Sequence, residues 1–230
     1  MGESRQSRSL GWEIGTLTFH EEILSLEQQR LLNTVGSFMN RQQCYLAGGT
    51  AIALILGHRK SVDLDWFTIH GFKDPEIFAR ELKSDLAKSS TLLTDIDVGK
   101  GTVYATANTV RMSILEYPYP LLNDLMDYPA PGCRVASLDD LSCMKLSAVA
   151  RRGSKKDFVD IYALLEKHAS LRQMFTAYRN KYADHDIATT VLSLAYFDDA
   201  DKEEMPEMLW DVSWEEIKAR ILSDVKKFRG

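Results

Sequence analysis

The sequence predicts an α+β fold, in which a mixed sheet with flanking helices is followed by a bundle of helices. Runs with the alternating spacing of strands occur between about 44 and 115, interspersed with helical runs, whereas only helical spacing recurs from Ser137 onward. Between these regions, residues 117–131 contain four prolines and show no clear period. We therefore predict an α/β core over 21–136 and a helical domain over 137–230, packed together as one body.

Each element follows from a local pattern. Helical spacing predicts a first helix from about Glu21 to Asn40, and Asp74-Pro75 is typical of another helix start. Three β-rich runs, separated by Gly99-Lys100-Gly101 and Asn108, predict an antiparallel meander over 91–98, 102–107 and 109–115. Helices are expected over about 137–151, 155–165, 171–182, 187–196 and 214–228. Residues 1–20 lack periodicity and are expected to form a loosely held arm.

Composition limits the classes of function. The 230 residues carry a net charge of −5, which argues against a broad basic surface for nucleic acid but leaves room for a local one. Two short basic clusters, His58-Arg59-Lys60 and Arg151 to Lys156, are candidates for such a surface or for a solvated face. No apolar run approaches the roughly 20 residues needed to span a bilayer. The three cysteines are far apart and are expected to be reduced thiols in a cytoplasmic protein.

The segment from Tyr45 to Trp66 contains the main candidate site. An apolar strand ends at Gly48-Gly49-Thr50, a short apolar helical run follows, and Ser61 to Trp66 then alternates as a half-buried strand does. In that strand Asp63 and Asp65 share one face, and Val62, Leu64 and Trp66 share the other. Two carboxylates about 7 Å apart can hold a divalent ion between them. The glycines allow close backbone approach, and a helix that opens at Thr50 favours an anion.

Simpler interpretations exist for both motifs. A lone Asp-x-Asp pair is often solvated surface, and Gly-Gly-Thr after a strand is often a tight turn. Asp95 and Asp97 have the same spacing without a preceding glycine turn and helix, and we interpret them as the wet face of a hairpin strand. The ordered sequence of strand, Gly-Gly-Thr, helix and strand favours a magnesium-nucleotide site at Asp63 and Asp65.

These motifs resemble a known family. Gly48-Gly49-Thr50, His58 to Ser61 and Asp63-Leu64-Asp65 are similar to the signature of AbiEii/AbiGii-type nucleotidyltransferase toxins, in the polymerase-beta-like superfamily. The resemblance extends to Tyr117 to Leu122 and to Met144-Lys145-Leu146 through Lys156 to Asp160. It implies a polymerase-beta-like fold, NTP as substrate and Mg²⁺ or Mn²⁺ as the metal.

The resemblance also implies roles for residues of the α/β core. Asp63 and Asp65 would bind the metal, while Gly48, Gly49 and Thr50 would hold the triphosphate through backbone N–H groups and the threonine hydroxyl. Lys60 and Ser61 lie close enough in sequence to assist, although they can equally form a turn before a strand. The superfamily usually has a third carboxylate on a neighbouring strand. The expected strand, Thr109 to Leu115, contains no acid, so Glu116 is the nearest candidate for the catalytic base.

Further candidates lie in the helical half. The resemblance assigns Lys145 to the active site, where its ammonium would bind the triphosphate, although a lysine on an apolar helix face can also snorkel to solvent. Asp157 and Asp160 share a helix face and can pair with Arg151, Arg152 or Lys145. By resemblance one of the two acids, more readily Asp160, shapes the site. We expect Lys145 and one of these acids to face the cleft that contains Gly-Gly-Thr and the aspartate pair.

Three functions remain open from the sequence. The first is a magnesium-dependent nucleotidyltransferase, the toxin of a toxin–antitoxin or phage-resistance pair, which transfers NMP from NTP to tRNA or to a protein. The second has a small hydroxylated acceptor, as in antibiotic-modifying relatives. The third is a non-catalytic nucleotide-binding protein, which the missing third acid makes reasonable. A cognate antitoxin is an expected partner of the first, and a membrane is not expected for any of them.

Overall fold

We describe the protein from a computed structural model, which covers residues 18–183 and 186–229. Most of the arm predicted over 1–20 therefore lies outside the described residues. From Thr18 to Glu116 the described chain contains a 3₁₀ turn, three α-helices and five strands: η1 (Glu21–Ile23), α1 (Leu26–Arg41), β1 (Cys44–Ala47), α2 (Gly48–Leu56), β2 (Leu64–Thr68), α3 (Pro75–Ala87), β3 (Leu93–Gly99), β4 (Thr102–Ala107) and β5 (Val110–Glu116).

One mixed sheet organises the described part of the N-terminal half. Its strand order is β3-β4-β5-β2-β1-β7-β6, where β6 is Met126–Asp127 and β7 is Arg134–Val135. Strand β2 pairs antiparallel with β1 and parallel with β5, and β3, β4 and β5 form the predicted antiparallel meander. Strands β6 and β7 fall in and just after the segment predicted to be loop. Strands of two residues are too short to produce a periodic signal, so the sequence could not reveal them.

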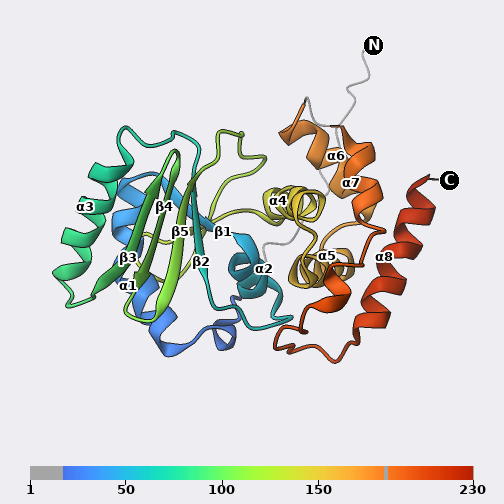
Figure 1. Cartoon of the computed structure of the whole chain (residues 1–230), viewed down its shortest axis with the longest axis horizontal. Helices are drawn as coiled ribbons and strands as arrows, with labels where there is room; N and C mark the ends of the chain where they lie inside the picture. The colour runs from blue at the N-terminus through green and yellow to red at the C-terminus, as the bar shows by residue number, and fades with distance from the viewer. Residues whose placement is uncertain (1–17, 184–185, 230) are drawn as a thin grey trace, which may run out of the picture.

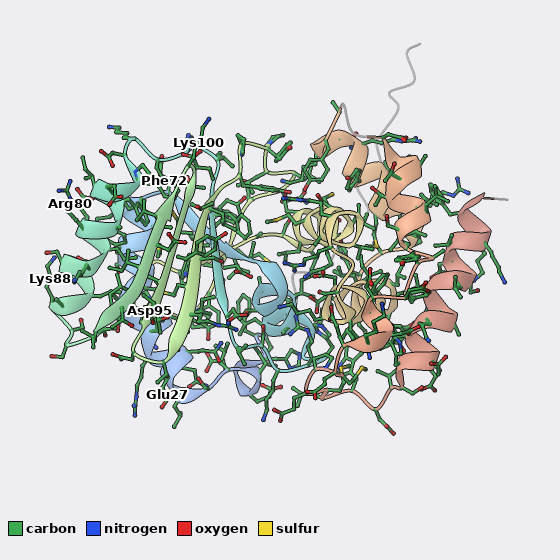
Figure 2. The ribbon with its side chains drawn as sticks, viewed as in Figure 1. Glu27, Phe72, Arg80, Lys88, Asp95 and Lys100 are labelled. Atoms are coloured by element: carbon green, nitrogen blue, oxygen red, sulfur yellow. The ribbon has the colours of Figure 1, made fainter. Side chains whose placement is uncertain are left out.

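Helices flank the sheet as their apolar stripes require. In Figure 1, α1 and α3 lie beside the sheet at one end of the molecule, and α2 lies between the sheet and the helices of the C-terminal half. Helix α3 buries Phe78, Leu82 and Leu86. Arg80 of this helix and Lys88, just after its end, face outward, as Figure 2 shows. These features confirm a mixed α/β fold with flanking helices.

From Ser137 onward the regular elements of the described chain are helices, as predicted. They are α4 (Leu138–Arg151), α5 (Lys155–Lys167), α6 (Leu171–Lys181), α7 (Ile187–Ser193), η2 (Ala200–Lys202) and α8 (Trp214–Arg229). Ser137 caps α4 by accepting a hydrogen bond from the Asp140 N–H at 3.1 Å. Helix α4 packs on α5, α6 and α7, and α2 contacts both α4 and α5. Among the described residues, we find no helix that is both long and apolar enough to cross a membrane.

Strand β2 begins later than the alternation suggested. It starts at Leu64, which is fully buried together with Trp66, whereas Val62 is 66% exposed. Val62 therefore does not share the buried face of the strand, which corrects the expectation. The pairing of β2 with both neighbours begins at Leu64 and Asp65, so the residues before them lack the ladder that fixes a pleated strand.

Candidate active site

The site is built around the start of helix α2, where two glycines allow side chains to approach closely. A Cβ atom on Gly48 would lie 2.4 Å from Asp65 Oδ2, and one on Gly49 would lie 2.2 Å from Arg59 Nη2. Gly48 also has a φ of +68°, a conformation that other residues rarely adopt. The helix begins at Gly48 and not, as expected, at Thr50. The glycines therefore form its first turn and accommodate Asp65 and Arg59.

Thr50 connects this helix to the aspartate segment. Its hydroxyl bonds the Ser61 hydroxyl at 2.7 Å and donates to the Asp63 carbonyl oxygen. Gln28 adds a second support, because its side chain donates to the Ser61 carbonyl at 2.9 Å. Gly-Gly-Thr and the aspartate pair thus lie together, as predicted. The Thr50 side chain is 1% exposed and its hydroxyl is bonded to protein, which corrects the expected contact between that hydroxyl and phosphate.

Asp63 and Asp65 are held by two side chains of β5. In the parallel register of β2 and β5, Asp65 lies opposite Ser113, whose hydroxyl donates to Asp65 Oδ1. Arg111 Nε donates to Asp63 Oδ1 at 3.0 Å. Both aspartates are partly exposed and line one pocket. Each carboxylate is therefore accessible from the pocket and oriented from the neighbouring strand.

Behind this pocket lies a buried network of charges that joins the two halves of the chain. Asp160 of α5 accepts two hydrogen bonds from Arg59, at 2.7 and 3.0 Å, and a third contact from His58 Nε2 at 2.7 Å. Lys145 Nζ lies 2.8 Å from Asp160 Oδ2. Asp160 is fully buried and does not line the pocket. Its position indicates that it orients Arg59 and Lys145 and does not touch a substrate.

Asp157 has a corresponding place one helical turn earlier. Its carboxylate lies 3.1 Å from Lys145 Nζ and accepts two hydrogen bonds from Arg152, at 2.8 and 2.9 Å. It also accepts from the Ser154 hydroxyl at 2.7 Å. Of the three partners considered from the sequence, Lys145 and Arg152 are thus observed for these acids. Like Asp160, Asp157 is fully buried and outside the pocket lining, so direct contact with substrate, as a catalytic residue, is not supported for either.

The network keeps Asp160 and Lys145 charged, whereas His58 is neutral. Burial by itself would raise the pKa of Asp160, but the charges of Arg59 and Lys145 hold that pKa well below its usual range. Burial would likewise lower the pKa of Lys145, yet the charges of Asp160 and Asp157 raise it above the ordinary value. In contrast, burial outweighs the Asp160 contact for His58 and lowers its pKa, which favours the neutral imidazole. Lys145 is therefore a fixed cation at neutral pH.

The pocket has a volume of about 250 Å³ and unites residues from distant parts of the chain. Carboxylates stand on its sheet side, and cations come from the segment after α2 and from α4 and α5. Its lining consists of Gly49, Arg59, Lys60, Ser61, Val62, Asp63, Asp65, Lys145, Arg152, Lys156, Pro206 and Glu207. Of the predicted site residues, Gly49, Lys60, Ser61, Asp63, Asp65 and Lys145 lie here, whereas Gly48 and Thr50 support the site from behind.

Several lining residues were not predicted as site residues. Arg59, Arg152 and Lys156 belong to the two basic clusters, so their charge was the available signal. Pro206 and Glu207 had no such signal, because they lie in an acidic segment far along the chain. This segment reaches the pocket by pairing with the residues after α2: the Lys60 N–H donates to the Glu207 carbonyl at 2.8 Å, and the Leu209 N–H donates to the His58 carbonyl at 2.9 Å.

Glu116 lies outside this site. It stands opposite Thr68 in the register of β2 and β5, three residues beyond Ser113, and its carboxylate accepts from the Phe72 N–H at 2.6 Å. Three residues of strand correspond to roughly 10 Å. The expectation that Glu116 supplies the third carboxylate is therefore wrong. It instead holds the turn that follows β2, against Gly71 and Gly101.

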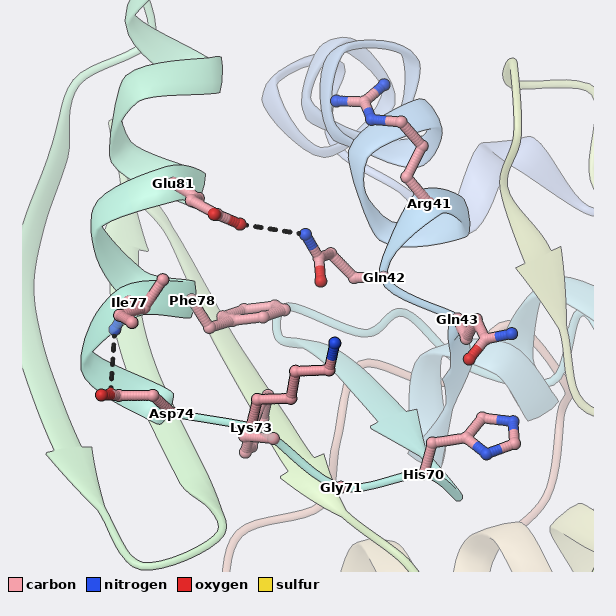
Figure 3. A pocket seen from close by; sticks show the side chains of 11 residues that line it. Arg41, Gln42, Gln43, His70, Gly71, Lys73, Asp74, Ile77, Phe78 and Glu81 are labelled. Carbon is pink, nitrogen blue, oxygen red and sulfur yellow. Dashed lines mark hydrogen bonds between the residues drawn. The ribbon is translucent and has the colours of Figure 1, made fainter.

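A larger pocket lies at the opposite end of the β1–β2 pair. It has a volume of about 460 Å³ and is lined by residues that precede β1, that follow β2 and that begin α3, including Gln42, Gln43, His70, Lys73 and Phe78 (Figure 3). None of the predicted site residues lines it. The chemical groups that suit nucleotide and metal are in the smaller pocket.

Comparison with known proteins agrees with this geometry. Residues 30–100 and 95–229 match the family described as "Nucleotidyl transferase AbiEii toxin, Type IV TA system". The chain belongs to the AbiEii nucleotidyltransferase family. The match includes Gly-Gly-Thr, the aspartate pair and the Lys145 to Asp160 segment. This AbiEii-family chain is therefore a nucleotidyltransferase.

Individual relatives of this AbiEii-family chain are similar over most of their length. An uncharacterised protein of Aquifex aeolicus (strain VF5) is 34% identical over 206 residues, which covers 89% of this chain and 97% of the relative. The structure of MenT4, a nucleotidyltransferase toxin of Mycobacterium tuberculosis H37Rv, matches with a TM-score of 0.52 at 14% identity, over 87% of this chain and 82% of MenT4. JHP933 from Helicobacter pylori gives a TM-score of 0.52 at 17% identity, over 92% and 95%. These two structures share the fold.

Proposed function

We propose that this chain transfers a nucleoside monophosphate from a magnesium-bound NTP to a macromolecular acceptor, either tRNA or a protein. The observation that carries the proposal is the pocket in which Asp63 and Asp65 face cations of both halves: Arg59, Lys60, Lys145, Arg152 and Lys156. A triphosphate needs such cations, and developing charge at its α-phosphate needs a metal beside the carboxylates. One pocket offers both.

The residues present fit a divalent ion. Mg²⁺ usually keeps several waters and is held by one or two carboxylates together with substrate phosphates. Asp63, just before β2, and Asp65, within it, supply two carboxylates, and both residues line the pocket. When bound, the ion would neutralise charge on the phosphates. The chain's own cations would hold the β- and γ-phosphates, and the first turn of α2 would add its backbone N–H groups.

The proposed reaction is an in-line displacement. The acceptor oxygen forms a bond to the α-phosphorus, the bond between that phosphorus and the β-bridging oxygen breaks, and pyrophosphate leaves. The acceptor loses one proton, which a carboxylate of the pocket can receive. Lys145 is suited to the leaving pyrophosphate, because the buried acids Asp157 and Asp160 fix its position and its charge.

A toxin role is part of the proposal. The matching family is described as the toxin of a type IV toxin–antitoxin system, and MenT4 is named a nucleotidyltransferase toxin. We therefore propose a cognate antitoxin as a partner. The net charge of −5 limits contact with nucleic acid to local basic groups, so the cations around the pocket are the surface on which a tRNA end would be recognised.

The test is transfer of label from α-labelled NTP to an acceptor pool. Asp63→Asn and Asp65→Asn should each reduce transfer at least 100-fold, a loss on the scale of a deleted electrostatic contribution to catalysis. Asp95→Asn and Asp97→Asn are matched controls, since these two acids have the same spacing and are exposed on β3. The controls should retain wild-type transfer. Equal transfer by wild type and both site variants would reject the metal role.

The acceptor pool separates the competing functions. Label on tRNA or protein supports the proposal, and label only on small hydroxylated molecules would replace it with a small-molecule transferase. Binding of Mg²⁺-NTP without transfer to RNA, protein or small molecules would indicate a non-catalytic nucleotide-binding protein. Nucleotide binding is measured separately by calorimetry, so that a failed transfer assay is not confused with a failed fold.

A further inference from the structure

Strand β5, the neighbouring strand on which the superfamily usually has a third carboxylate, instead places two donors on the aspartate pair. Arg111 and Ser113 are two residues apart and therefore share one face of β5. Arg111 Nε donates to Asp63 Oδ1 at 3.0 Å, and the Ser113 hydroxyl donates to Asp65 Oδ1. One oxygen of each aspartate is thus engaged by the neighbouring strand. The group that contacts Asp63 is the guanidinium of Arg111, which carries a full positive charge.

The ion pair between Arg111 and Asp63 can separate at little cost. The Arg111 side chain is 72% exposed and that of Asp63 is 30% exposed. Exposed ion pairs of this kind contribute little to stability, because water and salt screen them. Neither partner belongs to the buried network around Asp160, so separation of the two leaves that network intact. Arg111 can therefore leave Asp63 without disturbing the fold.

A free divalent ion would meet two obstacles at this site. Among the residues that the structure describes, no group of three or more Asp, Glu, His or Cys side chains is arranged to hold a metal, so protein ligands are few. The guanidinium of Arg111 also occupies Asp63, and it would repel an ion bound there over a few ångström. A nucleotide changes both conditions, since its phosphates add oxygen ligands and negative charge.

We propose that Arg111 makes metal binding depend on nucleotide. It holds Asp63 in the free protein, opposes binding of the ion alone, and yields Asp63 when the ion arrives with a triphosphate. This inference rests on the proposed function, because it assumes that Asp63 binds the metal. It assigns to β5 a positioning residue of opposite charge to the acid that the superfamily usually has on this strand.

The test compares Mn²⁺ binding to wild type and Arg111→Gln by calorimetry. Without nucleotide, Arg111→Gln should bind Mn²⁺ roughly three- to tenfold more tightly, the scale expected when one screened charge is removed near a divalent ion. With a saturating non-hydrolysable NTP analogue, the difference should shrink. Arg41→Gln is the matched control, because Arg41 is also an exposed arginine paired with an aspartate, Asp85, but lines the other pocket. It should bind Mn²⁺ as wild type does.

The outcomes separate this inference from the proposed function. Equal or weaker binding of free Mn²⁺ by Arg111→Gln, in a variant with unchanged thermal unfolding, overturns the role of Arg111. If Asp63→Asn still binds Mn²⁺ with the NTP analogue as wild type does, the metal role of Asp63 fails, and the proposed function fails with it. Loss of binding in Asp63→Asn together with no gain in Arg111→Gln would sink only the inference. The inference is supported if Arg111→Gln binds free Mn²⁺ more tightly than wild type and if this gain disappears when Asp63→Asn is added to the same protein.

Discussion

At the scale of single residues, two pairs of aspartates with the same side chain have different roles. Asp63 and Asp65 line the pocket, whereas Asp157 and Asp160 are fully buried behind it. A buried carboxylate costs free energy unless it is paired and hydrogen-bonded, and both acids meet this condition through Lys145 and arginines. They fix cations in place, and the partly exposed pair is left to meet a ligand.

Replacing Asp160 should therefore affect stability strongly. Asp160→Asn leaves Arg59 and Lys145 buried with less compensating charge, and removal of one partner from a buried ion pair costs about 3–5 kcal/mol. Urea unfolding followed by circular dichroism measures this loss. Asp85→Asn is the control, because Asp85 pairs with the exposed Arg41 and Lys88, and it should cost about 1 kcal/mol or less. Similar losses in both variants would mean that the buried network does not contribute as argued.

At the scale of elements, the start of α1 connects helix capping to the site. Ser25 and Gln28 form a capping box: Ser25 Oγ accepts from the Gln28 N–H at 3.2 Å, and Gln28 Oε1 accepts from the Ser25 N–H at 2.9 Å. The amide nitrogen of the same Gln28 side chain donates to the Ser61 carbonyl. One residue thus caps a helix and holds the segment that leads to Asp63.

Two substitutions distinguish these tasks. Ser25→Ala removes only the cap and should cost about 1 kcal/mol of unfolding free energy, with nucleotide binding unchanged. Gln28→Ala also leaves the partly buried Ser61 carbonyl without its donor, so it should cost about 1–3 kcal/mol and weaken binding of Mg²⁺-NTP. Thermal unfolding and calorimetric titration measure the two effects. Equal nucleotide affinity in both variants would show that the contact with Ser61 does not position the site.

At the scale of the whole molecule, the halves are joined through charges. His58 and Arg59 follow α2, whereas Lys145 and Asp160 belong to α4 and α5, and these four residues form one buried cluster. The segment from Glu207 to Leu209 adds backbone hydrogen bonds that bring the C-terminal half across the pocket. The division into a core over 21–136 and a helical domain over 137–230 stays a prediction, and these contacts support the packing of both parts as one body.

Stability should consequently fall in acid. The pKa values of Asp157 and Asp160 are lower in the folded protein than in the unfolded chain, so their contribution is present above the unfolded value of about 4 and is lost as pH falls below it. The pKa of His58 is also lowered by burial, so its protonation in the unfolded chain favours unfolding below about pH 6.5. Thermal unfolding between pH 8 and pH 3 measures this trend. A melting temperature that stays constant over that range would contradict it.

The sequence by itself determined the elements and the central motif. Alternation and helical spacing depend on neighbours in the chain, so the meander, the helices of the C-terminal half and the link from Gly-Gly-Thr to Asp63 and Asp65 could be predicted. For Lys145 the resemblance to a known motif, and not the local pattern, predicted a place beside the pocket, which it lines. The sequence did not place Glu116 correctly. The register of β2 and β5 decides whether a carboxylate on β5 reaches the site, and a local sequence pattern does not give that register.

The tertiary structure decided which charges meet. Arg59 and Asp160 are 101 residues apart in sequence, and only the packing of α2 on α5 brings them together. Pro206 and Glu207 reach the pocket for a similar reason, through backbone pairing with the residues after α2. Contacts of this kind depend on the global arrangement of helices and sheet, and no local period encodes them. The sequence therefore determined that Asp63 and Asp65 lie beside Gly-Gly-Thr, and the fold decided which cations surround them, because ion pairs between distant segments form only after those segments have packed.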